Sequence, residues 1–148
     1  MPSVMDLLIA KGAAEHTVYS ISPNTMVLDA VHQMNKHKVG ALVVMEDDHL
    51  VGMFTERDVL RRVLAEGQNP NNLKVADAMT GNVICCAPDT DVEEASRLMK
   101  DHRVRHLPIC DNSGNLLGLI SIGDLNAFYV SAQEMHIMQL TEYIYGRV

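Results

Sequence analysis

The sequence predicts an α+β fold of two β-α-β-β-α repeats packed in pseudo-twofold symmetry, with an N-terminal helix before them and an extended C-terminal helix after them. Three observations predict it. The turn at 22–25 returns at 87–90, apolar residues recur with helical spacing after each turn, and the pattern Gly-x-x-(Thr/Ser)-x-x-Asp occurs at 52–58 and 118–124. A repeat of about 60 residues buries too little surface to be stable alone, so the two copies should pack together.

Repeat 1 is predicted at 16–67, after an N-terminal helical extension at 1–15 that ends near Gly12, a residue type common at helix ends. Apolar residues spaced i, i+3, i+4 and i+7 from Val27 to Met34 define one face of its first helix. β-branched residues favour strands in the apolar runs that follow. The predicted elements are strands at 18–21, 41–45 and 50–54, and helices from 27 to about 38 and from 55 to about 64.

A polar linker rich in Asn is predicted at 68–74, and repeat 2 follows at 75–127, with its first strand at 81–84. Residues 128–148 are predicted to form a C-terminal helical extension. The last helix, beginning near Ile122, is longer than the repeat needs. Its apolar surface should therefore contact the N-terminal helix or another subunit.

Composition predicts a soluble, cytoplasmic globular protein. The chain has 148 residues, of which 47% are hydrophobic, and a formal net charge of -7. This acidic balance argues against nucleic-acid and anionic-membrane partners, which attract clustered Lys and Arg. No apolar run approaches the roughly 20 residues of a membrane span, and the N-terminus lacks the layout of a signal peptide.

Neither metal binding nor catalysis is predicted. The three cysteines, with Cys85 and Cys86 adjacent, lack Cys-x-x-Cys spacing and are expected to be reduced, and strand alternation should turn one of that pair into the core. The seven histidines lack zinc-ligand spacing. No nucleophile is paired with a base and no Gly-rich phosphate loop occurs, so the protein is predicted to be no enzyme and to need no catalytic cofactor.

The two Asp-ended motifs carry chemistry that suits a nucleotide. Each places a hydroxyl and a carboxylate at a strand-to-helix junction, Thr55 with Asp58 and Ser121 with Asp124. A carboxylate accepts two hydrogen bonds from the vicinal diol of a ribose, and the free N–H groups of a helix start favour an anion. The same spacing is also a capping box, so a purely structural role is the alternative.

The paired turns, the sequence His-Arg-Val-Arg-His-Leu-Pro-Ile at 102–109 and the two Asp-ended motifs resemble those of a tandem CBS-domain pair, also called a Bateman module. The resemblance covers about residues 17–126, and the chain is similar to small stand-alone CBS-pair proteins of the bacterial type. It implies a regulatory module of signal transduction that binds AMP, ADP, ATP or NAD(H), changes conformation, forms a homodimer and acts on an unidentified target protein. The alternative is a ligand-free scaffold that works through the C-terminal helix.

The resemblance also implies two ligand clefts between the repeats. Cleft A is predicted to use Thr55, Arg57, Asp58, Thr80, Val83, Ile84, Arg103, Val104, Arg105, His106, Leu107 and Pro108. Cleft B is predicted to use Ser20, Ile21, Lys38, Val39, Gly40, Ala41, Leu42, Ser121, Gly123 and Asp124.

The two predicted clefts differ in charge. Arg105 and His106 of cleft A correspond to Gly40 and Ala41 of cleft B. Positive side chains neutralise a polyphosphate or dinucleotide by charge-assisted hydrogen bonds. Only cleft A is predicted to have several such side chains. We therefore expect the two clefts to bind different ligands, or one ligand with different affinities.

Overall fold

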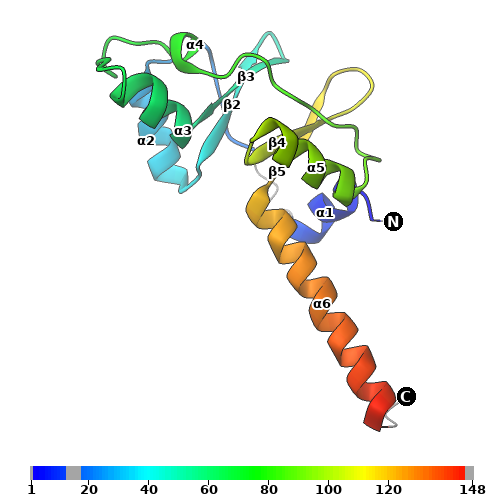
Figure 1. Ribbon diagram of the computed structural model, residues 1–148. Coiled ribbons are helices and arrows are strands. Elements are labelled where there is room, and N and C mark those ends of the chain that lie inside the picture. The colour runs from blue at the N-terminus through cyan, green and yellow to red at the C-terminus, as the bar shows by residue number, and fades with distance from the viewer. Residues whose placement is uncertain (1, 13–17, 146–148) are drawn as a thin grey trace.

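The computed structural model describes residues 2–12 and 18–145 and confirms the predicted α+β fold (Figure 1). In chain order the elements are α1 (Val4–Lys11), β1 (Ser20–Ile21), α2 (Val27–His37), β2 (Ala41–Glu46), β3 (His49–Thr55), α3 (Glu56–Asp58), η1 (Val59–Leu64), α4 (Val75–Ala78), α5 (Val92–His102), β4 (His106–Cys110), β5 (Leu116–Ser121) and α6 (Ile122–Tyr145).

The first repeat is built on a three-stranded sheet in the order β1-β2-β3. β1 runs parallel to β2, and β2 runs antiparallel to β3 with Ala41 opposite Thr55. The apolar face predicted for the first helix is the face that α2 buries, and it packs in one core with Phe54 of β3 and Val63 of η1. This core holds the β3–α3 junction, and with it Thr55, in a fixed place.

The second repeat has only the antiparallel pair β4-β5, and the strand predicted at 81–84 is wrong. Thr80 still pairs with Met53 of β3, through N–H···O bonds of 2.9 and 3.0 Å. The chain reaches β4 only at Cys86, whose N–H donates to the carbonyl of Pro108 at 3.0 Å. Residues 81–85 cross from one sheet to the other, so they run along neither ladder.

The helix predicted to start at Thr55 has the predicted extent, but beyond Asp58 it widens into a π-helix, η1. The N–H of Ala65 donates to the carbonyl of Leu60, and that of Gln68 donates to the carbonyl of Val63, both five residues back. π-Helical turns are rare and often lie at functional sites. Here the turn carries two arginines, described below, at the boundary between the repeats.

The N-terminal helix is a structural part of the second repeat. Val4, Leu7 and Leu8 of α1 are buried in the same core as α5, β4 and β5. Gly118 makes this packing possible, since a Cβ there would lie 2.6 Å from Leu8 Cδ1. α1 also touches α6, whose Leu125 is buried in the same core, so the predicted contact with the N-terminal helix holds for the start of α6.

α6 leaves the body of the molecule as a long rod (Figure 1). Leu125 near its start is buried, whereas Val130, Ile137 and Leu140 are 53%, 62% and 47% exposed. Within residues 2–12 and 18–145, no helix combines the length and apolar character that crossing a membrane requires. The exposed part of α6 is therefore apolar surface without an intramolecular partner among the described residues.

Candidate functional site

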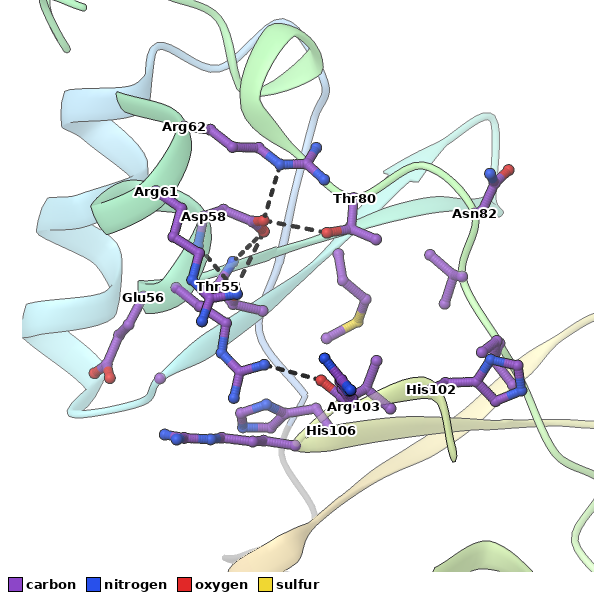
Figure 2. A pocket seen from close by; sticks show the side chains of 17 residues that line it. Thr55, Glu56, Asp58, Arg61, Arg62, Thr80, Asn82, His102, Arg103 and His106 are labelled. Carbon is purple, nitrogen blue, oxygen red and sulfur yellow. Dashed lines mark hydrogen bonds and ion pairs between the residues drawn. The ribbon is translucent and has the colours of Figure 1, made fainter. Parts of the chain in front are cut away.

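A cleft of about 360 Å³ opens between the two repeats, where cleft A was predicted (Figure 2). This volume falls within the range of small-molecule sites. The cleft is lined by Gly40, Met53, Thr55, Glu56, Arg57, Asp58, Arg61, Arg62, Thr80, Asn82, Val83, Ile84, His102, Arg103, Val104, Arg105 and His106. The structure thus brings together all the residues predicted for cleft A except Leu107 and Pro108. Those two are buried in β4, Leu107 within the core of the second repeat.

Asp58 is the polar centre of cleft A and is only 6% exposed. Its Oδ2 accepts hydrogen bonds from the N–H of Thr55 at 3.0 Å and from Thr55 Oγ1 at 3.2 Å, so the capping box read in the sequence is present. Its Oδ1 accepts from Thr80 Oγ1 at 3.1 Å and lies 3.7 Å from Arg62 Nε (Figure 2). The carboxylate therefore links the end of the first repeat to the segment that enters the second.

Five arginines line cleft A, and two of them are held by backbone carbonyls. Arg57 Nη1 donates to the carbonyl of Arg103 at 2.9 Å, which bridges the repeats, and Arg62 Nη1 donates to the carbonyl of Met79 at 2.7 Å. Glu56 and Asp58 are the opposing charges on the same wall. Guanidinium groups in this number can form several charge-assisted hydrogen bonds with a phosphate chain.

Arg61 and Arg62 were missed in the sequence. The signal was available, because they follow Asp58 by three and four residues, and on a helix these positions face the same side. Gly40, predicted for cleft B, instead lies in the wall of cleft A. A Cβ at this position would lie 3.3 Å from Glu56 Cδ, so a larger residue would push the glutamate side chain.

His106, at the start of β4, lines cleft A and lies opposite Ser121 in the β4–β5 ladder. Burial lowers the pKa of His106 below its ordinary value of 6.5; Asp124 and Glu56 oppose this shift, while Arg105 and Lys11 reinforce it. The imidazole is therefore neutral at pH 7. It can offer one donor and one acceptor to a ligand in cleft A.

The carboxylate predicted for cleft B is already paired with a cation. Asp124 Oδ2 accepts from the N–H of Ser121 at 2.7 Å, and Ser121 Oγ accepts from the N–H of Asp124 at 3.1 Å, so this motif also caps its helix. Lys11 Nζ lies 2.9 Å from the same Oδ2 and donates to the carbonyl of Leu119 at 3.2 Å. No local signal in the sequence predicts Lys11 here, because its place depends on how α1 packs.

The other residues predicted for cleft B lie in the first repeat, apart from Gly123 at the start of α6. Ile21 and Leu42 belong to its core, whereas Ala41 packs in an apolar cluster that also contains Leu119 of β5. Gly123 lies beside Ser121, and a Cβ there would be 3.5 Å from the serine hydroxyl. The remaining three are Ser20 in β1, and Lys38 and Val39 in a hollow beside Glu56.

The cysteines are free, and Cys86 is buried while Cys85 is exposed, so one of the pair points into the core as predicted, although the two residues do not lie in the strand on which that prediction was based. Burial raises the pKa of Cys86 to about 11, and burial together with the neighbouring Cys85 raises the pKa of Cys110 to about 12. Both thiols are protonated at pH 7 and therefore poorly nucleophilic. Among the side chains that the structure describes, no three His, Cys, Asp or Glu residues converge as a metal site requires.

Known proteins match this chain in sequence and fold. A family model for the CBS domain matches residues 11–65 and 75–131. The mitochondrial CBS domain-containing protein CBSX3 of Arabidopsis thaliana is 36% identical over 150 residues, which cover 97% of this chain and 72% of that protein. A solved structure of a protein with CBS domains from Burkholderia ambifaria has a TM-score of 0.84 at 37% identity and covers 89% of this chain and 96% of that one.

A fourth match concerns the fold alone. The CBS-domain pair of the protein MJ0100, solved with 5'-methylthioadenosine and S-adenosyl-L-methionine, has a TM-score of 0.77 at 20% identity, over 89% of this chain and 98% of that chain. The two segments matched by the family model each supply one side of cleft A.

Proposed function

The chain belongs to the CBS-domain family as a tandem pair, a regulatory module, and we propose that it regulates by binding an adenosine-containing ligand in cleft A. One observation carries the proposal: the carboxylate of Asp58 and five arginines face a single cleft of about 360 Å³ that both repeats line. The carboxylate suits the ribose diol, and the guanidinium groups suit phosphate. The adenosyl ligands in the MJ0100 structure support this ligand class.

The charge of the cleft favours a phosphorylated ligand. The whole chain carries a formal net charge of -7, yet the wall of cleft A holds five arginines against Glu56 and Asp58. A concave positive patch on an acidic protein concentrates anions locally. AMP, ADP, ATP and NAD(H) are therefore the proposed ligands, and those with more phosphate should bind more tightly.

Binding would be coupled to the packing of the repeats. The contacts that join the repeats at the cleft include the hydrogen bond from Thr80 to Asp58 and that from Arg57 to the carbonyl of Arg103. A ligand that takes over one of these partners changes the relative stability of two arrangements of the repeats, which is all that a regulatory ligand can do. This change is the proposed signal to a target protein. The three cysteines, an odd number, are free and form no disulfide framework, which suits a reducing compartment, and we place the module in the cytoplasm.

A thermal-unfolding series tests the ligand proposal. Protein purified free of nucleotide is heated alone and with AMP, ADP, ATP or NAD(H). A ligand that binds the native state at 100 times its Kd adds about 2.7 kcal/mol of stability, so the midpoint should rise. Asp58→Asn should remove the rise, whereas Asp89→Asn, an exposed control, should keep it. An unchanged midpoint with all four ligands would refute the proposal.

The exposed face of α6 favours a homodimer. Val130, Ile137 and Leu140 lie at i, i+7 and i+10, which places them along one side of the helix, and each is about half exposed or more. Between Leu125 and Thr141 only Glu134 carries a formal charge, so two such helices repel each other little. The second candidate, a ligand-free scaffold, rests on the same face. It predicts that a different protein binds to α6, and that nucleotides leave the midpoint of thermal unfolding unchanged.

A further inference from the structure

A lysine of the N-terminal helix α1 pairs with the carboxylate of the second Asp-ended motif. Lys11, in the last turn of α1, forms an ion pair of 2.9 Å with Asp124 Oδ2, and the two side chains are 17% and 20% exposed. The ammonium also donates to the carbonyl of Leu119 at 3.2 Å. Two of its three N–H donors are thus used within the second repeat.

α1 is anchored, so Lys11 is delivered to Asp124 by a rigid element. Val4, Leu7 and Leu8 are buried in the core of the second repeat. The backbone of the helix start is tied to the loop before α5, where the N–H of Val4 donates to the carbonyl of Thr90 at 2.8 Å. A surface ion pair contributes little on its own, but this pair is half-buried and its lysine is held in place by a packed helix.

The equivalent carboxylate of cleft A is paired differently. Asp58 Oδ1 accepts from Thr80 Oγ1, a hydroxyl that can rotate, and Arg62 Nε stands 3.7 Å away. Thr80 and Arg62 both line cleft A, so each can contact a bound ligand once its interaction with Asp58 is broken. A ribose that reached Asp124 would instead replace an ammonium by neutral hydroxyls and leave a half-buried cation without its counter-charge.

We propose that Lys11 acts as a built-in occupant of cleft B, which takes the ribose-binding carboxylate Asp124 and leaves the native chain with a single adenosine-ligand site, cleft A. This inference rests on the proposed function, because it assumes that Asp58 and Asp124 would both hold a ribose when free. It makes α1 the element that decides how many ligands the module binds. Displacement of α1 would open a second site.

Binding stoichiometry tests the inference. Equilibrium dialysis with saturating ATP should give one ATP per native chain and two per Lys11→Met chain. Lys100→Met removes the same charge from an exposed position on α5 and should leave one. The double variant Lys11→Met with Asp124→Asn should return the count to one, which assigns the second ATP to Asp124. If Lys11→Met does not fold, Lys11→Gln serves in its place, with the thermal midpoint of each variant as the check.

The outcomes separate this inference from the proposed function. Two ATP per native chain, one ATP in both native and Lys11→Met chains, or loss of binding in Lys11→Met would each overturn the role of Lys11 while leaving an adenosine-ligand module. Binding only after substitution of Lys11 would support Lys11 as the occupant of cleft B and refute cleft A as the native site. No ATP bound by any of the chains would refute both.

Discussion

Gly52 lies directly against the backbone of Thr80: a Cβ at position 52 would be 2.9 Å from the Thr80 carbonyl oxygen and 2.6 Å from Met79 Sδ. Met53 and Thr80 exchange hydrogen bonds of 2.9 and 3.0 Å at this point. The absence of a side chain at Gly52 lets the segment that enters the second repeat lie on β3. That close approach brings Thr80 Oγ1 to Asp58, so one glycine positions part of cleft A.

Gly52→Ala should therefore destabilise the protein and disturb the contact between Thr80 and Asp58 in cleft A. The new methyl group must push a backbone carbonyl, and overpacking of this kind costs about 1–3 kcal/mol. Gly81→Ala is the matched control, because a Cβ there meets nothing within 4 Å. Urea unfolding should show the full loss for Gly52→Ala and a change within about 0.5 kcal/mol for Gly81→Ala. Equal losses would show that the contact with Thr80 carries no energetic weight.

Arg105→Gln should weaken ATP binding but not adenosine binding. Arg105 is exposed at the wall of cleft A, so its replacement leaves the core intact. A hydrogen bond to a charged group is worth about 1.5–3 kcal/mol, so the Kd for ATP should rise about 10-fold or more. Calorimetric titrations with ATP and adenosine measure the two effects.

The control for this variant is Arg97→Gln, on the exposed face of α5, which removes the same charge outside the cleft. It should leave the Kd for ATP unchanged at 150 mM salt. The Debye length at this ionic strength is about 8 Å, so exposed charges that lie farther apart are largely screened. An equal loss in both variants would mean that the general field of the protein, and not cleft A, attracts the phosphates.

Most of the fold could be read from the sequence because its information is local. The spacing of Val27 to Met34 defined the buried face of α2, and the duplicated motifs defined Thr55 with Asp58 and Ser121 with Asp124 as junction residues. The strand predicted at 81–84 failed for a non-local reason. Thr80 stays bound to Met53 in the other sheet, so the chain turns toward β4 only at Cys86.

The site was harder to predict than the fold. Arg61 and Arg62 follow from helical spacing, once Asp58 is placed in the cleft. Lys11 does not, because its pairing with Asp124 requires α1 to dock on the second repeat, which depends on the fit of Leu8 to Gly118. Nothing in the residues around Lys11 encodes that contact.

The pH dependence of stability should contain a step from His106. Burial lowers its pKa in the folded protein below the ordinary value of 6.5. Above pH 6.5 both states hold a neutral imidazole, and the stability is fully present. As the pH falls through 6.5 toward the lower folded pKa, the unfolded chain takes up a proton that the folded chain does not, so stability declines.

His106→Gln should make the unfolding free energy less dependent on pH between 7 and 5, since glutamine does not titrate. Denaturant unfolding at several pH values checks this. The exposed His32→Gln is the control and should leave the slope as it is in the native protein. A slope that His106→Gln leaves unaltered would assign the acid sensitivity to other groups.

The apolar side of α6 should hold a dimer together. Ile137→Glu puts a charge in the middle of the line formed by Val130, Ile137 and Leu140, and burying that carboxylate between two helices without a partner is costly. The dimer dissociation constant should rise by at least about 10-fold. Gln139→Glu adds the same charge almost opposite Ile137 around the helix and should leave the dimer intact.

Sedimentation velocity over a range of protein concentrations measures both variants, and ATP binding by the same samples shows whether dimerisation and cleft A are linked. Because α6 begins at Ile122, directly after Ser121, a dimer through α6 would place the Asp124 motif at the base of the interface helix. If the Ile137→Glu variant is monomeric but binds ATP with unchanged affinity, dimerisation and ligand binding in cleft A are independent. A native protein that is monomeric at all concentrations would instead leave the exposed side of α6 to a different protein, as the scaffold alternative requires.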